Sequence, residues 1–176
     1  QNTILPVSRS DLVSPPVLLI GEAASGKTTF TKQYAFDTAR TSLKARVIVQ
    51  IPLTIRVIDL VNTISAAQSE GVQLTADDDL LDIHLNSVRY DEATRQLLKE
   101  MHWQRRLTLL LDGMDEAGAC RELLEAYVSC RLVTEVHLCV TARPQGIARM
   151  ELFDPFFMKV TVLDLDQEQQ GHIVKG

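Results

Sequence analysis

The stretch PPVLLIGEAASGKTTF, residues 15–30, joins a short apolar run to a loop of small residues that ends in a lysine. The apolar residues 17–20 predict a buried strand, and residues 27–39 have the pattern of a helix. Four positions match the phosphate-binding pattern G-x-x-x-x-G-K-[ST]: Gly21, Gly26, Lys27 and Thr28. Because the pattern lies between a strand and a helix, the stretch predicts a loop that holds nucleotide phosphates.

The residue types of this loop suit phosphate chemically. Small side chains let the backbone curl so that successive N–H groups point inward, and the following helix adds its positive N-terminal end. We expect Lys27 to reach the outer phosphates and the Thr28 hydroxyl to complete the shell of a Mg²⁺ ion. A glycine-rich turn with a solvated lysine is the alternative. The candidate nucleotide-binding residues are Gly21, Glu22, Ala23, Ala24, Ser25, Gly26, Lys27, Thr28 and Thr29.

Length and composition fit one compact domain, since 176 residues with 45% apolar content are enough to bury a core. No apolar run approaches the ~18 residues of a membrane span, and the N-terminus lacks a secretory pattern. The formal net charge of −5, with scattered Lys and Arg, gives no footprint for nucleic acid. Because the chain starts at Gln1 and stops in mid-pattern, we expect a piece of a longer protein.

The cysteines favour the reducing cytoplasm. Cys120, Cys130 and Cys139 are odd in number, widely spaced and placed in apolar segments, which does not suit a disulfide framework. We expect them to be packing thiols, and no His or Cys spacing suggests zinc. His137 and Cys139 alternate within one apolar run and are expected to pack.

Short apolar runs bounded by turn residues recur along the chain and predict a parallel sheet covered on both faces. These runs are residues 17–20, 46–51, 107–111, 136–140 and 158–163. Helical patterns separate them, so the fold class is α/β and doubly wound. The acidic residues 77–79 predict a solvated loop leading into a helix, although a regulatory loop is the alternative.

Two of the expected helices have a distinct apolar side. Residues 91–103 begin with Asp91 as N-cap and place Ala93, Leu97 and Met101 on one face. In residues 120–130, positions 120, 123, 124 and 127 form an apolar stripe. We therefore expect Cys120 to pack in the core rather than to react.

Acidic residues follow the apolar strand of RRLTLLLDGMDEA. Asp112 comes directly after five apolar strand residues, where open α/β sheets bind ligands, and a carboxylate there can hold a magnesium-bound water. The small Gly113 leaves room beside the metal, and Asp115 and Glu116 can orient or polarise the attacking water. We expect Glu116 to polarise the water and Asp115 to support it. Both could instead cap the next helix.

A third signal is VHLCVTARPQG, in which another buried strand ends at Thr141. Pro144 biases Arg143 away from helical backbone and so ends the element. Arg143 is then placed to sense the terminal phosphate. An arginine in a surface turn is the competing interpretation.

Together these three segments resemble the NACHT domain, a member of the STAND class of P-loop NTPases found in innate-immune sensors. GEAASGKTT is similar to the family's Walker A loop, LLLDGMDEA to its extended Walker B, and VTARP to its sensor 1, where Ala142 replaces the common Ser. RVIVQIPLTI resembles its second strand, which runs into a Leu-containing turn. VTVLDLDQEQQGHIV resembles the segment that leads into its first helical subdomain.

The resemblance implies a P-loop NTPase three-layer sandwich, with a five-stranded parallel sheet of order 2-3-4-1-5 and helices on both faces. It implies an N-terminal flank at 1–14, a nucleotide-binding domain at 15–165 and the start of a truncated helical subdomain at 166–176. The further subdomains of the family, which supply a histidine to the phosphates, lie beyond this sequence. Adenine rather than guanine follows from the resemblance alone.

By resemblance, the leading hypothesis is a signalling switch that binds ATP or ADP with Mg²⁺ and slowly hydrolyses ATP. The nucleotide would control conformation and self-association, and the effector and sensor domains are unknown. One alternative is a P-loop small-molecule kinase, which needs an acceptor site and usually an Arg-bearing lid. The other is an interaction module that keeps the loop only to fold around ADP.

Overall fold

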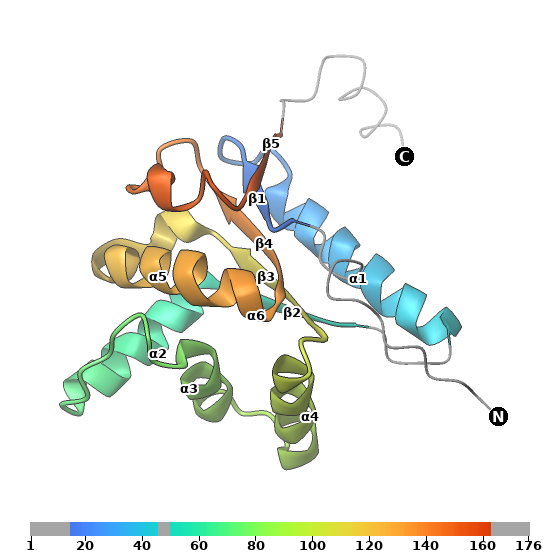
Figure 1. Cartoon of the computed structure of the whole chain (residues 1–176), viewed down its shortest axis with the longest axis horizontal. Coiled ribbons are helices and arrows are strands. Elements are labelled where there is room, and N and C mark those ends of the chain that lie inside the picture. Colours follow the sequence, from blue (N-terminus) through green and yellow to red (C-terminus); the bar gives the residue numbers. More distant parts are fainter. Residues whose placement is uncertain (1–14, 46–49, 163–176) are drawn as a thin grey trace.

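The computed structural model describes residues 15–45 and 50–162, which form a five-stranded parallel sheet (Figure 1). Its strands are β1 (Val17–Ile20), β2 (Ile51–Arg56), β3 (Leu107–Asp112), β4 (His137–Ala142) and β5 (Met158–Thr161). The strand order is β2-β3-β4-β1-β5. The predicted α/β class, strand number and strand order are therefore confirmed.

Helices flank this sheet, with α1 on one side and α2, α3, α5 and α6 on the other (Figure 1). The α-helices are α1 (Lys27–Ala45), α2 (Val57–Ser69), α3 (Leu80–Ser87), α4 (Glu92–Trp103), α5 (Arg121–Tyr127) and α6 (Val133–Glu135). Shorter turns are the 3-10 segments η1 (Met114–Cys120) and η3 (Met150–Leu152) and the π-helical turn η2 (Val128–Leu132). In the described part of the chain, no helix is long and apolar enough to cross a membrane.

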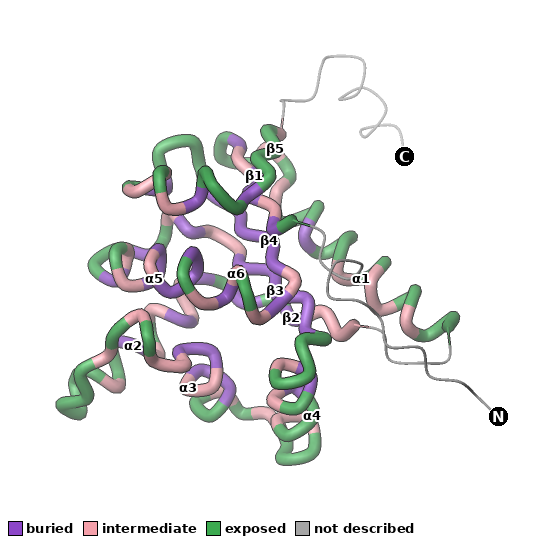
Figure 2. The backbone as a smooth tube through the Cα atoms, viewed as in Figure 1, coloured by how far each residue is buried: buried purple, intermediate pink, exposed green. Residues whose placement is uncertain are grey.

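The core lies around β3, the strand between β2 and β4 (Figure 2). Leu107, Leu109, Leu110 and Leu111 of this strand are each at most 1% exposed. Full burial of a leucine side chain stabilises the fold by about 1.5–3 kcal/mol. Both faces of β3 are covered, which explains its continuous apolar run. Its last residue is the acid Asp112, which therefore lies at the carboxyl end of a central strand.

The predicted position of the second strand was wrong. The strand was expected over 46–51 with a turn after it, but β2 is Ile51–Arg56, and residues 46–49 lie outside the described part. Leu53, expected in the turn, is buried and pairs with Leu109. Pro52 lacks an N–H donor, yet β2 is an edge strand, where a proline is tolerated.

The other edge strand, β5, departs from the expectation of two covered faces. All four of its residues are exposed, including Met158 at 49%. The strand ends at Thr161, and the expected last residue, 163, lies outside the described part. The expected flank at 1–14, the 165/166 boundary and the helical-subdomain segment 166–176 lie outside it as well.

Helix α4 begins as expected, because the Asp91 carboxylate accepts the N–H of Thr94 at 2.9 Å. The expected apolar face was right for Met101, which is buried, but wrong for Ala93 and Leu97, which are exposed, and Leu98 is buried in their place. Leu97 and Leu98 are four and three residues before Met101, so helical spacing alone suits either one. The packing of α4 against α3 and β3 selects Leu98.

The expected stripe before β4 holds, although its helix is divided into η1, α5 and η2. Cys120, Leu124 and Tyr127 are buried and Leu123 is partly buried, so the Cys120 thiol packs in the core. Cys139 is also buried, and burial, with a contribution from Asp112, raises the pKa of its thiol to about 11. His137 beside it is partly buried, and burial lowers its pKa. The expectation of a packing thiol was wrong for Cys130, which is exposed.

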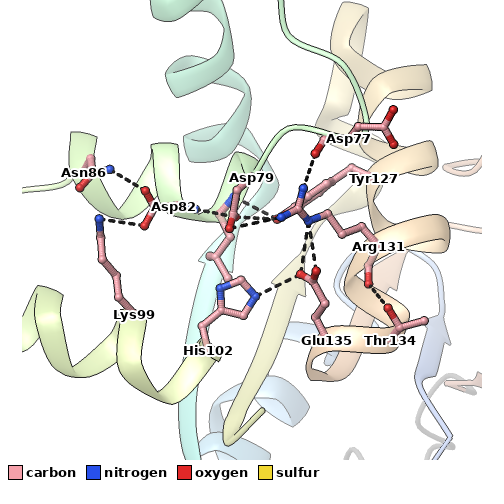
Figure 3. A network of polar contacts seen from close by, with 11 residues as sticks. Asp77, Asp79, Asp82, Asn86, Lys99, His102, Tyr127, Arg131, Thr134 and Glu135 are labelled. Carbon is pink, nitrogen blue, oxygen red and sulfur yellow. Dashed lines mark hydrogen bonds and ion pairs between the residues drawn. The ribbon is translucent and has the colours of Figure 1, made fainter. Parts of the chain in front are cut away.

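A polar network connects α3 and α4 to the chain after α5 (Figure 3). Arg131 in η2 lies 3.6 Å from the Asp79 carboxylate and 3.2 Å from that of Glu135, and it also donates to the carbonyl of Asp77. Glu135 in turn lies 3.3 Å from Nε2 of His102. Asp79 is the N-cap of α3. Thus the acidic triplet forms a loop that leads into a helix, as expected.

The buried His84 predicts a pH dependence of folding stability. Its Nδ1 lies 3.0 Å from Oγ1 of Thr63, and burial lowers its pKa below the ordinary value of 6.5. Between the two pKa values the unfolded chain binds a proton that the folded chain does not, so stability falls as the pH drops below about 6.5. We expect the urea midpoint of wild type to fall more between pH 7.5 and 5.5 than that of His84→Gln. Parallel pH profiles of the two proteins would contradict this.

Candidate functional site

The loop between β1 and α1 is tightly curled. The Gly21 N–H donates to the carbonyl of Ala142 at 3.2 Å, which holds the loop beside the end of β4. A Cβ added at Gly21 would lie 2.5 Å from Oγ of Ser25 and would require it to move. Ala24 and Gly26 have φ values of 61° and 95°, in the left-handed region. The loop thus reverses direction and places Lys27 at the start of α1.

The Lys27 side chain folds back over this loop. Its ammonium donates to the carbonyls of Gly21 and Glu22, at 2.7 Å each, and lies 3.4 Å from Oγ of Ser25. A lysine ammonium has three N–H donors and turns freely on a flexible stem. Lys27 is therefore held at the loop by neutral acceptors that a phosphate oxygen can replace.

Asp112, the last residue of β3, accepts a hydrogen bond from a threonine hydroxyl on each side. The Thr28 hydroxyl donates to Oδ2 at 2.8 Å, and the Thr141 hydroxyl of β4 donates to Oδ1 at 2.7 Å. Thr141 Oγ1 also accepts the N–H of Gly113 at 2.9 Å. Gly113 has a φ of 87°, so the backbone turns sharply there. Three segments far apart in the sequence thus meet at one carboxylate.

Thr28 and Asp112 fit a Mg²⁺ ion by the chemistry and spacing of their oxygens. Neighbouring ligands of an octahedral Mg²⁺ with bonds of about 2.0–2.1 Å lie about 3 Å apart, close to the 2.8 Å found here. Within the described ranges, no group of three or more His, Cys, Asp or Glu residues could hold a metal. An ion bound by these two residues would therefore take its remaining ligands from phosphate and water.

Asp115 and Arg143 form an ion pair, with 2.9 Å between Oδ2 of Asp115 and Nε of Arg143. Oδ1 of Asp115 also accepts the backbone N–H of Arg143 at 3.2 Å. Gly146 closes the turn by donating to the carbonyl of Arg143 at 2.8 Å. A Cβ at Gly146 would lie 2.6 Å from Cβ of Asp115, so the turn packs directly on the acidic segment.

Glu116 lies over Gly113, since a Cβ added there would be 3.3 Å from Cδ of Glu116. Glu116 is exposed, and within residues 15–45 and 50–162 its side chain forms no hydrogen bond or ion pair. It attracts the guanidinium of Arg56, whose pKa is raised mainly by a hydrogen bond to Asp59. The two neighbouring acids thus differ, because Asp115 is paired and the carboxylate of Glu116 is open to a ligand.

A hollow of about 190 Å³ brings most of these residues together. Its lining is Ala23, Ala24, Lys27, Thr28, Arg56, Asp112, Gly113, Asp115, Glu116, Thr141 and Arg143. The candidates Gly21, Ser25, Gly26 and Thr29 shape the loop or the first turn of α1 but do not line it. Glu22 lines an adjoining hollow that shares Asp115 and Arg143. The predicted metal ligands and all three predicted catalytic residues therefore lie at one site.

The sequence interpretation missed two residues of this site, Arg56 and Thr141. Arg56 ends β2 as Asp112 ends β3, and the two are partners in the strand register. A charged residue at the end of a strand was a usable signal, but the strand had been placed too early. Thr141 was recognised only as the end of β4. A carboxylate at the end of a buried strand needs a hydrogen-bond donor beside it, and this need could have identified Thr141.

A family model described as the NACHT domain matches residues 15–175. The chain belongs to the NACHT domain family. The match contains the curled loop, both strand ends and the hollow between them, and a NACHT domain is a nucleotide-binding domain of the P-loop NTPase class. No curated protein matched the chain.

The position of Asp112 in this NACHT domain is expected to depend on Thr141. Thr141→Val removes a donor to the carboxylate and leaves the Gly113 N–H without its acceptor, at a net cost of about 1–2 kcal/mol. We expect the Mg²⁺ concentration for half-maximal ATP binding to rise about tenfold, measured by titration calorimetry. Thr108→Val, a buried threonine at the start of β3, is the control and should leave it unchanged. Equal Mg²⁺ dependence in all three proteins would contradict this role.

Proposed function

We propose that this NACHT domain is a nucleotide-gated signalling switch that binds ATP or ADP with Mg²⁺ and slowly hydrolyses ATP. The observation that supports it is the shared hollow, which combines a lysine, a hydroxyl–carboxylate pair for a metal, an open carboxylate and two arginines. A triphosphate with its metal needs cationic groups and metal ligands on one side and a group that orients water on another. The site meets each need with a separate residue.

Lys27, Thr28 and Asp112 serve binding in this proposal. Lys27 exchanges its carbonyl acceptors for oxygens of the outer phosphates, which makes charge-assisted hydrogen bonds. Thr28 and Asp112 would hold the metal, which would supply positive charge that neutralises the phosphates. The Thr141 donor keeps the Asp112 carboxylate facing Thr28.

Glu116 is the residue we propose to orient the attacking water and accept its proton. Its carboxylate lines the hollow without a hydrogen-bond partner among the described residues, whereas Asp115 is already paired with Arg143. Attack on the terminal phosphorus breaks its bond to the bridging oxygen and yields ADP and inorganic phosphate. The structure thus favours Glu116 over Asp115 as the catalytic acid–base group.

Arg143 is the residue we propose to report the terminal phosphate. Its side chain is 56% exposed and that of Asp115 is 16% exposed, and such partly exposed ion pairs contribute about 0–1 kcal/mol. A phosphate oxygen can therefore compete for the guanidinium at little cost. The partner of the Arg143 side chain would then differ between the triphosphate and diphosphate states, and this change of partner provides the gating of conformation and self-association.

The free thiols of the three cysteines support the reducing cytoplasm as the proposed location. These residues are Cys120, Cys130 and Cys139. Self-association through this domain, and the effector and sensor domains it would serve, belong to the same proposal.

Two substitutions separate nucleotide binding from hydrolysis. Lys27→Ala is expected to weaken ATP binding ten- to a hundredfold or more, because charge-assisted hydrogen bonds of about 1.5–3 kcal/mol each are lost. Glu116→Gln should retain ATP within about twofold and lose single-turnover hydrolysis. Binding is measured by calorimetry and turnover by release of labelled phosphate.

Lys32→Ala on α1 and Glu70→Gln after α2 are matched controls, since both side chains are exposed and away from the hollow. Both should behave as wild type. Wild-type ATP affinity in Lys27→Ala would contradict the phosphate site. Binding without turnover in wild type and Glu116→Gln would favour an interaction module, and transfer of phosphate to a nucleoside would favour a kinase.

A further inference from the structure

Glu125 of α5 is a fully buried carboxylate, with 0% exposure, and it does not line the nucleotide hollow. Glutamate is almost never fully buried unless it is paired. Its partners all come from the chain after β4. Oε1 accepts the N–H of Ala148 at 2.7 Å, and Oε2 accepts that of Arg149 at 3.1 Å and lies 3.5 Å from the Arg149 Nε.

The segment held by Glu125 is continuous with the turn that carries Arg143. Gly146 bonds back to Arg143 at 2.8 Å, and Ile147, which follows it, is buried at 8% exposure. Ala148 therefore comes two residues after the turn closes at Gly146, with the buried Ile147 between them. Arg149 is fixed a second time, because its guanidinium also donates to the carbonyl of Glu122 on α5.

The two ends of this turn are held by two carboxylates from one stretch of chain. Asp115 in η1 binds Arg143 at the beginning of the turn, and Glu125 binds Ala148 and Arg149 at its end. Segments η1 and α5 follow each other directly after β3. The segment after the strand-terminal acid thus determines where the turn lies relative to Asp112.

We propose that Glu125 is a positioning residue that holds the Arg143 turn against the nucleotide hollow and so enables the domain to distinguish ATP from ADP. This inference rests on the proposed function of Arg143 as the group that meets the terminal phosphate. The pair of Arg143 with Asp115 is partly exposed and exchangeable, whereas the Glu125 carboxylate is fully buried, and buried charge-assisted bonds are costly to break. Arg143 can therefore change partner while its backbone stays in place.

The test compares Glu125→Gln with Arg143→Ala and with the double variant. Glutamine preserves size and one acceptor oxygen but removes the charge and the second acceptor. We expect Glu125→Gln to reduce the ratio of the ADP to the ATP dissociation constant to the value of Arg143→Ala, with ADP affinity within about twofold. The double variant should lose no more, since the two residues act as one unit. Glu122→Gln, an exposed side chain on the same helix, is the control.

Amide hydrogen exchange gives a second readout that does not depend on nucleotide. The amides of Ala148 and Arg149 should exchange at least tenfold faster in Glu125→Gln, while those of β3 stay protected. If Glu125→Gln does not fold, Glu125→Asp keeps the charge but shortens the side chain, and it should change both readouts in the same direction.

Unchanged protection of Ala148 and Arg149 would overturn the inference, as would additive effects of Glu125→Gln and Arg143→Ala on the dissociation-constant ratio. The failure of the proposed function is distinguishable, because Arg143→Ala alone would then leave the ratio unchanged. In that case the role of Arg143 is wrong and the link to nucleotide discrimination falls with it. The exchange rates still decide whether Glu125 holds the turn.

Discussion

The carboxylate of Asp112 is the point on which the geometry of this site depends. It ends β3, whose other five residues are buried, and it accepts hydrogen bonds from hydroxyls of α1 on one side and β4 on the other. Since β3 is packed between β2 and β4, its end cannot shift without disturbing the core. The stability of the fold and the placement of the proposed metal ligand Asp112 therefore come from the same strand.

The cationic groups around this carboxylate already have partners. Lys27 is held by loop carbonyls, Arg143 by Asp115 and Arg56 by Asp59. The Lys27 acceptors are neutral and Asp59 is partly exposed, while Asp115, at 16% exposure, keeps the backbone N–H of Arg143 when a phosphate oxygen takes the guanidinium. Of these three cations, Arg143 has its partner in a distant segment, because Asp115 precedes it by 28 positions, so a ligand that replaces Asp115 can uncouple two segments while the sheet stays fixed. In contrast, Glu125 holds its segment through a carboxylate that is 0% exposed.

The sequence was most informative where a strand ends in a charged residue. Asp112 and Arg143 could be placed at one edge because parallel strands end on the same side. The apolar run 46–51 looked more strand-like than IPLTIR, and only the sheet order shows that Pro52 lies on an edge strand that tolerates it. Because the strand was predicted too early in the chain, neither the role of Arg56 at its end nor the following helix α2 was predicted. The pairing of Asp115 with Arg143 joins residues 28 positions apart, so spacing could not distinguish the two neighbouring acids. The choice of Leu98 over Leu97 likewise depends on the neighbours of α4.

The central claim is that Thr28 and Asp112 bind the metal of a nucleotide. It is tested most directly by electron paramagnetic resonance of Mn²⁺, used in place of Mg²⁺, with a non-hydrolysable ATP analogue and the wild-type and Asp112→Asn proteins. We expect wild type to bind one Mn²⁺ tightly only when the analogue is present, and Asp112→Asn to bind it at least tenfold more weakly. Equal Mn²⁺ affinity in the two proteins, or tight binding without the analogue, would contradict the claim.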